Sequence, residues 1–140
     1  MADAAVVLMS LGAARTESGY VAGGLADLRE AETRVHAVGR TKFLPDLYRL
    51  LASAELAAGD VAAARDLATR SLDLASQAGA RHLGAMAQRV IAETHLAEGD
   101  AGAARPLLEA SCATLREAGE TVELAKSEAL LRRVADGVSG

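Results

Sequence analysis

"AAGDVAAARDL" at residues 57–67 returns forty residues later as "AEGDAGAARPL" at residues 97–107. A phrase repeated at a fixed distance is typical of a chain built from copies of one structural unit. Glycines keep the same period: one set stands at positions 19, 59 and 99, and a second at positions 39, 79 and 119. The repeat therefore decides the fold, and its unit is about forty residues long.

The segments between these glycines have the length and the apolar spacing of α-helices. Alanine and leucine, two of the best helix formers, dominate them, whereas one Phe, two Tyr and no Trp leave little for strands. A glycine after each segment can adopt the left-handed conformation that ends a helix. Asp60 and Asp100 then stand where a side chain caps the next helix. We therefore expect an all-α chain of about seven helices, over residues 4–14, 21–38, 45–58, 61–78, 81–98, 101–118 and 121–135.

Small residues follow each corner, and serines recur further along the same helices. Ala64 and Ala104 occupy equivalent places just after the two "GD" corners, and Gly24 stands at that place in the first unit. We expect two antiparallel helices to cross most closely there, where only small side chains fit. Ser71 and Ser111 recur forty residues apart and are predicted to be packing residues. Stacked hairpins would bury a continuous core, with the last helix as a lid.

Composition and charge narrow the class of protein. The chain has 140 residues, the size of one domain, and a formal net charge of −4. That charge argues against a nucleic-acid partner, which requires a basic face. Cys112 is the single cysteine and excludes an intrachain disulfide, as expected in a reducing compartment. The apolar run 4–14 is too short for a bilayer and lacks the basic residues of a secretory signal, so we expect a cytoplasmic protein without membrane association.

The spacing of the units resembles the tetratricopeptide repeat. A leucine or isoleucine beside a small residue recurs at Leu11-Gly12, Leu51-Ala52 and Ile91-Ala92, followed by the glycine turn and the small residue of the second helix. The family's usual period is about 34 residues, so the period of 40 here implies longer helices. The resemblance implies a right-handed superhelical array of antiparallel helix hairpins in a single domain over 1–140, with repeats 4–43, 44–83 and 84–123 and a capping helix over 124–136.

Long alanine-rich units of this kind are similar to those of bacterial signalling ATPases and transcriptional activators. In the family, the first helix of each pair lines a concave groove, and the inward positions carried over to this chain include the predicted partner-binding residues Arg49, Ser53, Arg89, Glu93 and Arg133. Arginines in such a row would hold a carboxylate or a phosphate in a bidentate manner. The simpler interpretation is that they only solvate an exposed helix face beside acidic residues.

No pattern in the chain points to catalysis, a metal or a cofactor. The histidines stand at unrelated positions of the repeat, and no His-x3-His or Cys-x2-Cys spacing occurs. Cys112 takes the place that Leu72 holds one unit earlier, which predicts a small buried apolar residue. The acidic residues stand at helix starts and on exposed faces, where the helix dipole and solvation explain them. We therefore expect no catalytic residue, and a protein that is not an enzyme.

Three functional hypotheses remain open from the sequence. The first is a non-catalytic module of a bacterial regulatory or signalling system that binds a partner protein or peptide through the groove. The second is a regulatory domain that senses a small ligand, for which an enclosed apolar pocket would be required. The third is a homodimer formed through the apolar face of the N-terminal helix, which Val7→Glu or Leu11→Glu would split.

Overall fold

The computed structural model describes residues 3–136, and most of these residues are helical. These residues form seven α-helices and one short 3-10 helix, and no strand. The elements are α1 (Ala4–Glu17), α2 (Val21–Val38), η1 (Thr41–Phe43), α3 (Leu44–Ala57), α4 (Val61–Ala78), α5 (Arg81–Ala97), α6 (Ala101–Ala118) and α7 (Thr121–Ala135). The prediction of an all-α chain with about seven helices is confirmed. Helix α1 continues beyond the predicted 4–14, and the other boundaries agree within one residue.

The corners between helices are built as the sequence predicts. The Asp60 carboxylate accepts a hydrogen bond from the Ala63 N–H at 3.0 Å, and that of Asp100 accepts one from the Ala103 N–H at 3.0 Å. Gly59, before the first of these caps, has a φ of +92°, which lies in the region that favours glycine. Each "GD" pair therefore ends one helix and begins the next.

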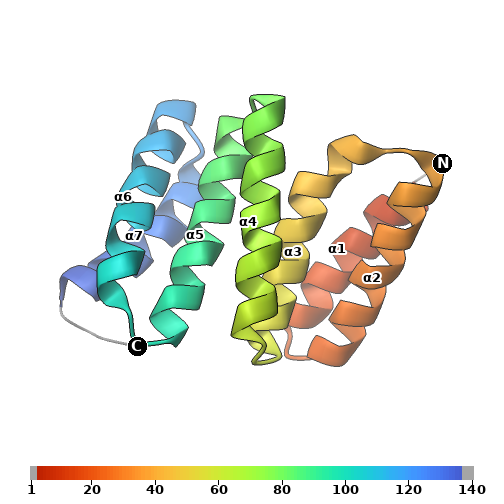
Figure 1. The fold of residues 1–140 in the computed structure, drawn as a ribbon, viewed down its shortest axis with the longest axis horizontal. Helices are drawn as coiled ribbons and strands as arrows, with labels where there is room; N and C mark the ends of the chain where they lie inside the picture. Colours follow the sequence, from red (N-terminus) through yellow and green to blue (C-terminus); the bar gives the residue numbers. More distant parts are fainter. Residues whose placement is uncertain (1–2, 137–140) are drawn as a thin grey trace.

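The helices pack in chain order, in three hairpins followed by a single helix. Figure 1 shows the hairpins side by side along the long axis, from α1 and α2 at one end to α6 and α7 at the other. Helices α1, α3 and α5 each pack against the helix that follows them, α4 packs on α5, and α6 packs on α7. Helix α3 also contacts both α1 and α5. The first helices of successive hairpins therefore lie next to one another.

The core follows this row of helices. One cluster, which includes Leu28, Leu47 and Leu51, fills the space between the first two hairpins. A second, which includes Leu108 and Val134, lies between the last hairpin and α7. Buried apolar area of this kind contributes roughly 25 cal/mol per Å². Stability is therefore shared along the row instead of residing at one centre.

Helices α1 and α2 approach each other closely where small residues were predicted. A Cβ atom added to Gly24 on α2 would lie 2.8 Å from the backbone oxygen of Gly12 on α1, closer than such atoms come. Ala64 and Ala104, at the equivalent places in α4 and α6, are fully buried. The small residues after each corner therefore set how tightly each hairpin closes.

Two buried serines join neighbouring helices at equivalent points. The Ser71 hydroxyl on α4 donates to the carbonyl oxygen of Pro45 on α3 at 2.6 Å. Forty residues on, the Ser111 hydroxyl on α6 donates to the carbonyl oxygen of Ala85 on α5 at 2.7 Å. Each bond satisfies the donor of a buried hydroxyl. The prediction that these serines are packing residues is confirmed.

Helix α1 carries three exposed large apolar side chains, Val6, Val7 and Leu11. Val7 is 49 % exposed and Leu11 is 40 % exposed, one helical turn apart. Val6 on the same helix is also exposed. Across residues 3–136, each helix is either too short or too polar to cross a bilayer.

Candidate binding site

Three neighbouring helices carry the five predicted partner-binding residues. Arg49 and Ser53 lie on α3, Arg89 and Glu93 on α5, and Arg133 on α7. Residues four positions apart share one face of a helix, so each of the first two pairs points in one direction. Helix α3 packs against α5, and side-chain bonds join α5 to α7. The fold thus brings the five residues to adjacent helices, although they do not all meet the same surroundings.

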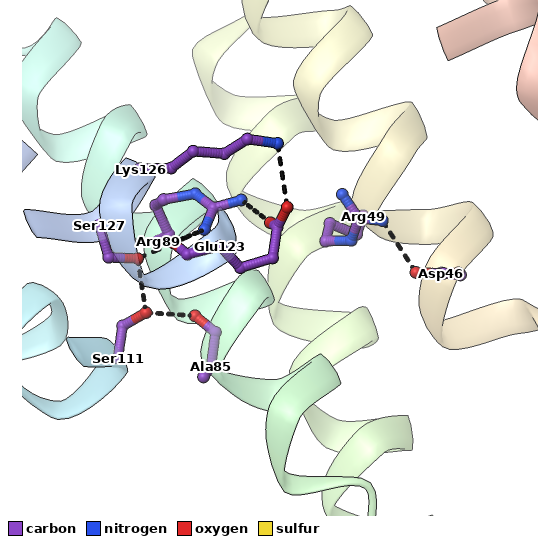
Figure 2. Close-up of polar contacts among 8 residues, drawn as sticks. All are labelled: Asp46, Arg49, Ala85, Arg89, Ser111, Glu123, Lys126 and Ser127. Carbon is purple, nitrogen blue, oxygen red and sulfur yellow. Dashed lines mark hydrogen bonds and ion pairs between the residues drawn. The ribbon is translucent and has the colours of Figure 1, made fainter. Parts of the chain in front are cut away.

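Arg89 is buried, and its guanidinium bonds to other residues of the protein. Only 7 % of the residue is exposed. Its guanidinium donates to the Glu123 carboxylate at 2.6 Å, to the Glu123 carbonyl oxygen at 3.1 Å and to the Ser127 hydroxyl at 3.3 Å (Figure 2). The Ser127 hydroxyl in turn shares a hydrogen bond of 2.9 Å with that of Ser111. Arg89 therefore fastens α7 to α5, and the expectation that it faces a partner does not match this geometry.

Glu123 is the acidic centre of this cluster, and it is not among the residues predicted from the sequence. Burial raises the pKa of the Glu123 carboxyl, but hydrogen bonds from Arg89 and Lys126 and their positive charges outweigh burial and hold the pKa below its usual value. The Lys126 ammonium donates to the second carboxylate oxygen at 3.0 Å. Glu123 is therefore ionised at neutral pH and keeps Arg89 in place.

Arg49 has different surroundings, although it is the repeat equivalent of Arg89. Its guanidinium donates to the carboxylate of Asp46, one turn earlier on the same helix, at 2.8 Å (Figure 2). Its Nε atom is buried without a hydrogen-bond partner among residues 3–136. The sequence shows one difference between the two arginines, because Leu83 stands one unit before Glu123 and its side chain offers no acceptor to Arg49. An acidic residue one helix pair further on, present for Arg89 and absent for Arg49, is the sequence signal that distinguishes the surroundings of the two arginines.

Glu93 and Arg133 meet at a small hollow on the same face. The hollow has a volume of about 190 Å³, and its other lining residues are Leu56 of α3, Leu96 and Ala97 of α5, and Leu130 of α7. Within residues 3–136, neither the Glu93 carboxylate nor the Arg133 guanidinium has a hydrogen-bond or ion-pair partner, since Arg89 and Lys126 bond to Glu123 instead. Two predicted residues of opposite charge therefore line one apolar hollow with their bonding groups unused.

Burial dominates the electrostatics of Glu93. It raises the pKa of the Glu93 carboxyl above its usual value, and the positive charges of Arg89, Arg133 and Lys126 offset only part of that rise. The folded state therefore binds this proton more tightly than the unfolded chain does. Such a group adds stability below its ordinary pKa, and that contribution is lost as the pH rises through the raised value.

Glu93→Gln should therefore raise the free energy of unfolding at neutral pH. We expect a gain of about 0.5–1 kcal/mol, the usual size for one partly buried polar group. The gain should shrink towards zero at about pH 3, where the wild-type carboxyl is protonated in both states. Urea unfolding of the two proteins at both pH values measures the difference. A gain that does not change with pH would contradict the assigned role of burial.

Cys112 lies apart from this face and is 4 % exposed. Burial raises the pKa of its thiol above the usual value, so the sulfur stays protonated at neutral pH. The prediction of a small buried apolar residue is confirmed. In the part of the chain that the structure describes, no group of three or more His, Cys, Asp or Glu side chains is placed to hold a metal ion.

On the face formed by α3, α5 and α7, the buried Arg89 holds α7 against α5. Beside it, Glu93 and Arg133 line an accessible hollow. Comparisons of the chain with family models, with curated proteins and with solved structures gave no match. The site is thus defined by the geometry of the chain itself.

Proposed function

We propose that the chain is a non-catalytic module that binds a partner protein or peptide through the face formed by α3, α5 and α7. The observation that carries this proposal is the hollow where Glu93 and Arg133 lie between leucine side chains, both unpaired among residues 3–136. A surface that keeps unused donors and acceptors beside apolar area is suited to binding another molecule.

The proposal includes an arrangement of the tetratricopeptide type. We infer that the hairpins belong to a right-handed superhelical array in which first helices line the concave side. The contacts of α3 with both α1 and α5 support this arrangement. The long alanine-rich units are in keeping with a bacterial regulatory or signalling protein, and the single cysteine with a cytoplasmic location.

Binding would use a surface that is already formed. Leu56 and Leu130, which are half-buried, would supply affinity through buried apolar area, whereas Glu93 and Arg133 would fix the orientation of the bound chain. Arg89 acts as a positioning residue, since it keeps α7 against α5 and so preserves the hollow.

The hollow favours a peptide over a drug-sized ligand. Pockets for such ligands are usually about 300–1,000 Å³ and enclose most of the molecule. The volume at Glu93 and Arg133 is about 190 Å³, enough for part of a longer chain. A small-ligand sensor therefore has less support than a peptide-binding module.

Self-association is the second candidate function, and the surface of α1 favours it. Ala4, Val7, Leu11 and Ala14 are exposed, carry no charge and alternate in spacings of three and four residues. That spacing places them on one seam of the helix, as in paired helices. Sedimentation velocity at increasing protein concentration should detect a dimer, and a monomer at every concentration would remove this candidate.

Selection from a displayed peptide library tests the main proposal. Arg133→Glu should weaken the binding of selected peptides at least tenfold, about 1.4 kcal/mol, because it reverses the charge at the hollow. Arg132→Glu is the matched control, since Arg132 is also exposed but lines the separate hollow between α6 and α7. Its effect should stay within about twofold.

Fluorescence anisotropy with labelled peptides gives both affinities, and circular dichroism checks that each variant remains helical. Equal losses in Arg133→Glu and Arg132→Glu would contradict the groove assignment. A library that yields no peptide above background would contradict the proposed function itself.

A further inference from the structure

The residues that line the hollow on α3, α5 and α7 indicate which kind of peptide residue it can bind. Each of the three helices contributes one leucine to its wall: Leu56 from α3, Leu96 from α5 and Leu130 from α7. Such walls accept a hydrocarbon group and disfavour a charged one, because a charge loses hydration there. The volume of about 190 Å³ limits that group to about one side chain.

The polar groups at the hollow balance each other in charge. Glu93 offers carboxylate oxygens that accept hydrogen bonds, and Arg133 offers guanidinium N–H groups that donate them. The neighbouring cations Arg89 and Lys126 already bond to Glu123 at 2.6 and 3.0 Å. Glu93 and Arg133 could thus bind a ligand that has one hydrogen-bond donor and one acceptor close together.

A peptide amide next to an aliphatic side chain meets both requirements. Its N–H would donate to the Glu93 carboxylate, and a carbonyl oxygen of the same residue would accept from the Arg133 guanidinium. A ligand with a single charge would be attracted by one of these residues and repelled by the other, at a cost in desolvation. A neutral peptide unit leaves no uncompensated charge.

We propose that the Glu93–Arg133 hollow is a subsite for one internal aliphatic residue, of leucine size, in an extended peptide. This inference rests on the proposed peptide-binding function and adds the chemical class of the bound residue. The aliphatic side chain packs against the leucines of the hollow. Glu93 accepts a hydrogen bond from the backbone N–H of the bound residue, and Arg133 donates one to its carbonyl oxygen. A charged peptide end or an acidic side chain, each with a single charge, is disfavoured in this subsite.

Nuclear magnetic resonance of the 15N-labelled full chain tests the subsite with small probes. N-acetyl-L-leucinamide carries the side chain and both neutral amides, and should shift amide resonances around Glu93 on α5 and Arg133 on α7. N-acetyl-L-alaninamide keeps the amides but lacks most of the side chain, and should bind about tenfold more weakly. L-leucine has the side chain but an ammonium and a carboxylate in place of the amides. Both charges would lose hydration beside the leucine walls, so it should bind more weakly than the blocked amide.

Variants complete the test. Arg133→Ala should weaken the binding of N-acetyl-L-leucinamide, whereas Arg132→Ala should leave it unchanged. Binding of L-leucine equal to or tighter than that of the blocked amide would overturn the proposal and point to a free amino acid as the ligand. Shifts with none of the probes would also overturn it.

The library separates a failure of this inference from a failure of the proposed function. Peptides that bind the wild type and are lost with Arg133→Glu, yet share no aliphatic position, would contradict the subsite and leave the groove standing. With a correct subsite, replacing the shared aliphatic residue by serine in a selected peptide should lower affinity at least tenfold, about 1.4 kcal/mol.

Discussion

Arg89→Met should lower the free energy of unfolding by about 3 kcal/mol. The substitution keeps most of the buried volume but removes the donors that satisfy the Glu123 carboxylate and the Ser127 hydroxyl. Breaking a buried ion pair costs about 3–5 kcal/mol, because the remaining charge stays desolvated. The lower end applies here, since Lys126 still donates to Glu123.

Urea unfolding followed by circular dichroism measures this loss, and Arg81→Met is the matched control. Arg81 pairs with Glu117 at 3.1 Å, but their side chains are 73 % and 68 % exposed. Such a pair contributes about 1 kcal/mol at most. A second variant, Arg89→Met with Glu123→Leu, should recover most of the loss because neither charge of the buried pair remains. Equal effects of Arg89→Met and Arg81→Met would contradict the role of Arg89 as an internal strut.

The free energy of unfolding of the wild type should depend on pH through the Arg89–Glu123 pair. The pKa of Glu123 is depressed in the folded state, so its contribution to stability is present above the ordinary pKa and is lost as the pH falls through the depressed value. Arg89→Met removes the largest cause of that depression. The difference between wild type and variant should therefore narrow in acid.

Gly24→Ala should destabilise the first hairpin by about 1–3 kcal/mol, the usual cost of overpacking. The new Cβ would lie 2.8 Å from the Gly12 backbone oxygen, so α1 and α2 would have to separate. An alanine in a helix gains about 1 kcal/mol over glycine, and the clash outweighs this gain.

Gly102→Ala on α6 is the control for this prediction. A Cβ there meets only a carboxylate oxygen of Asp100, at 3.6 Å, which is ordinary contact. Gly102→Ala should therefore raise the free energy of unfolding by about 0.5–1 kcal/mol. Urea unfolding of both variants gives the sign of each change in the free energy of unfolding. A gain in both would show that α1 and α2 do not depend on the close approach of Gly12 and Gly24.

The helices and corners were predictable because their causes are local in the chain. Asp60 and Asp100 cap helices through bonds to residues three positions away, and the six glycines at the period of forty end helices through their own φ angles. The serine bonds followed from the repeat, since Ser71 and Ser111 reach carbonyls at the same sequence distance. The path of the backbone therefore needed little information from distant residues.

The candidate site was less predictable because it depends on side chains from other helices. Arg49 and Arg89 are equivalent by the repeat, but Asp46 beside the first is replaced by Met86 beside the second. Glu123 on α7 then takes the acidic role for Arg89. The meeting of Glu93 with Arg133 likewise depends on how α7 packs, which spacing within one unit does not determine.

Chemical-shift mapping of a library-selected peptide on the 15N-labelled chain tests the central claim most directly. The proposed function predicts that the perturbed amides cluster around Leu56 on α3, Glu93 on α5 and Arg133 on α7, and that α2, α4 and α6 change little. Perturbations centred on the exposed face of α1, or on the hollow at Arg132 between α6 and α7, would contradict it.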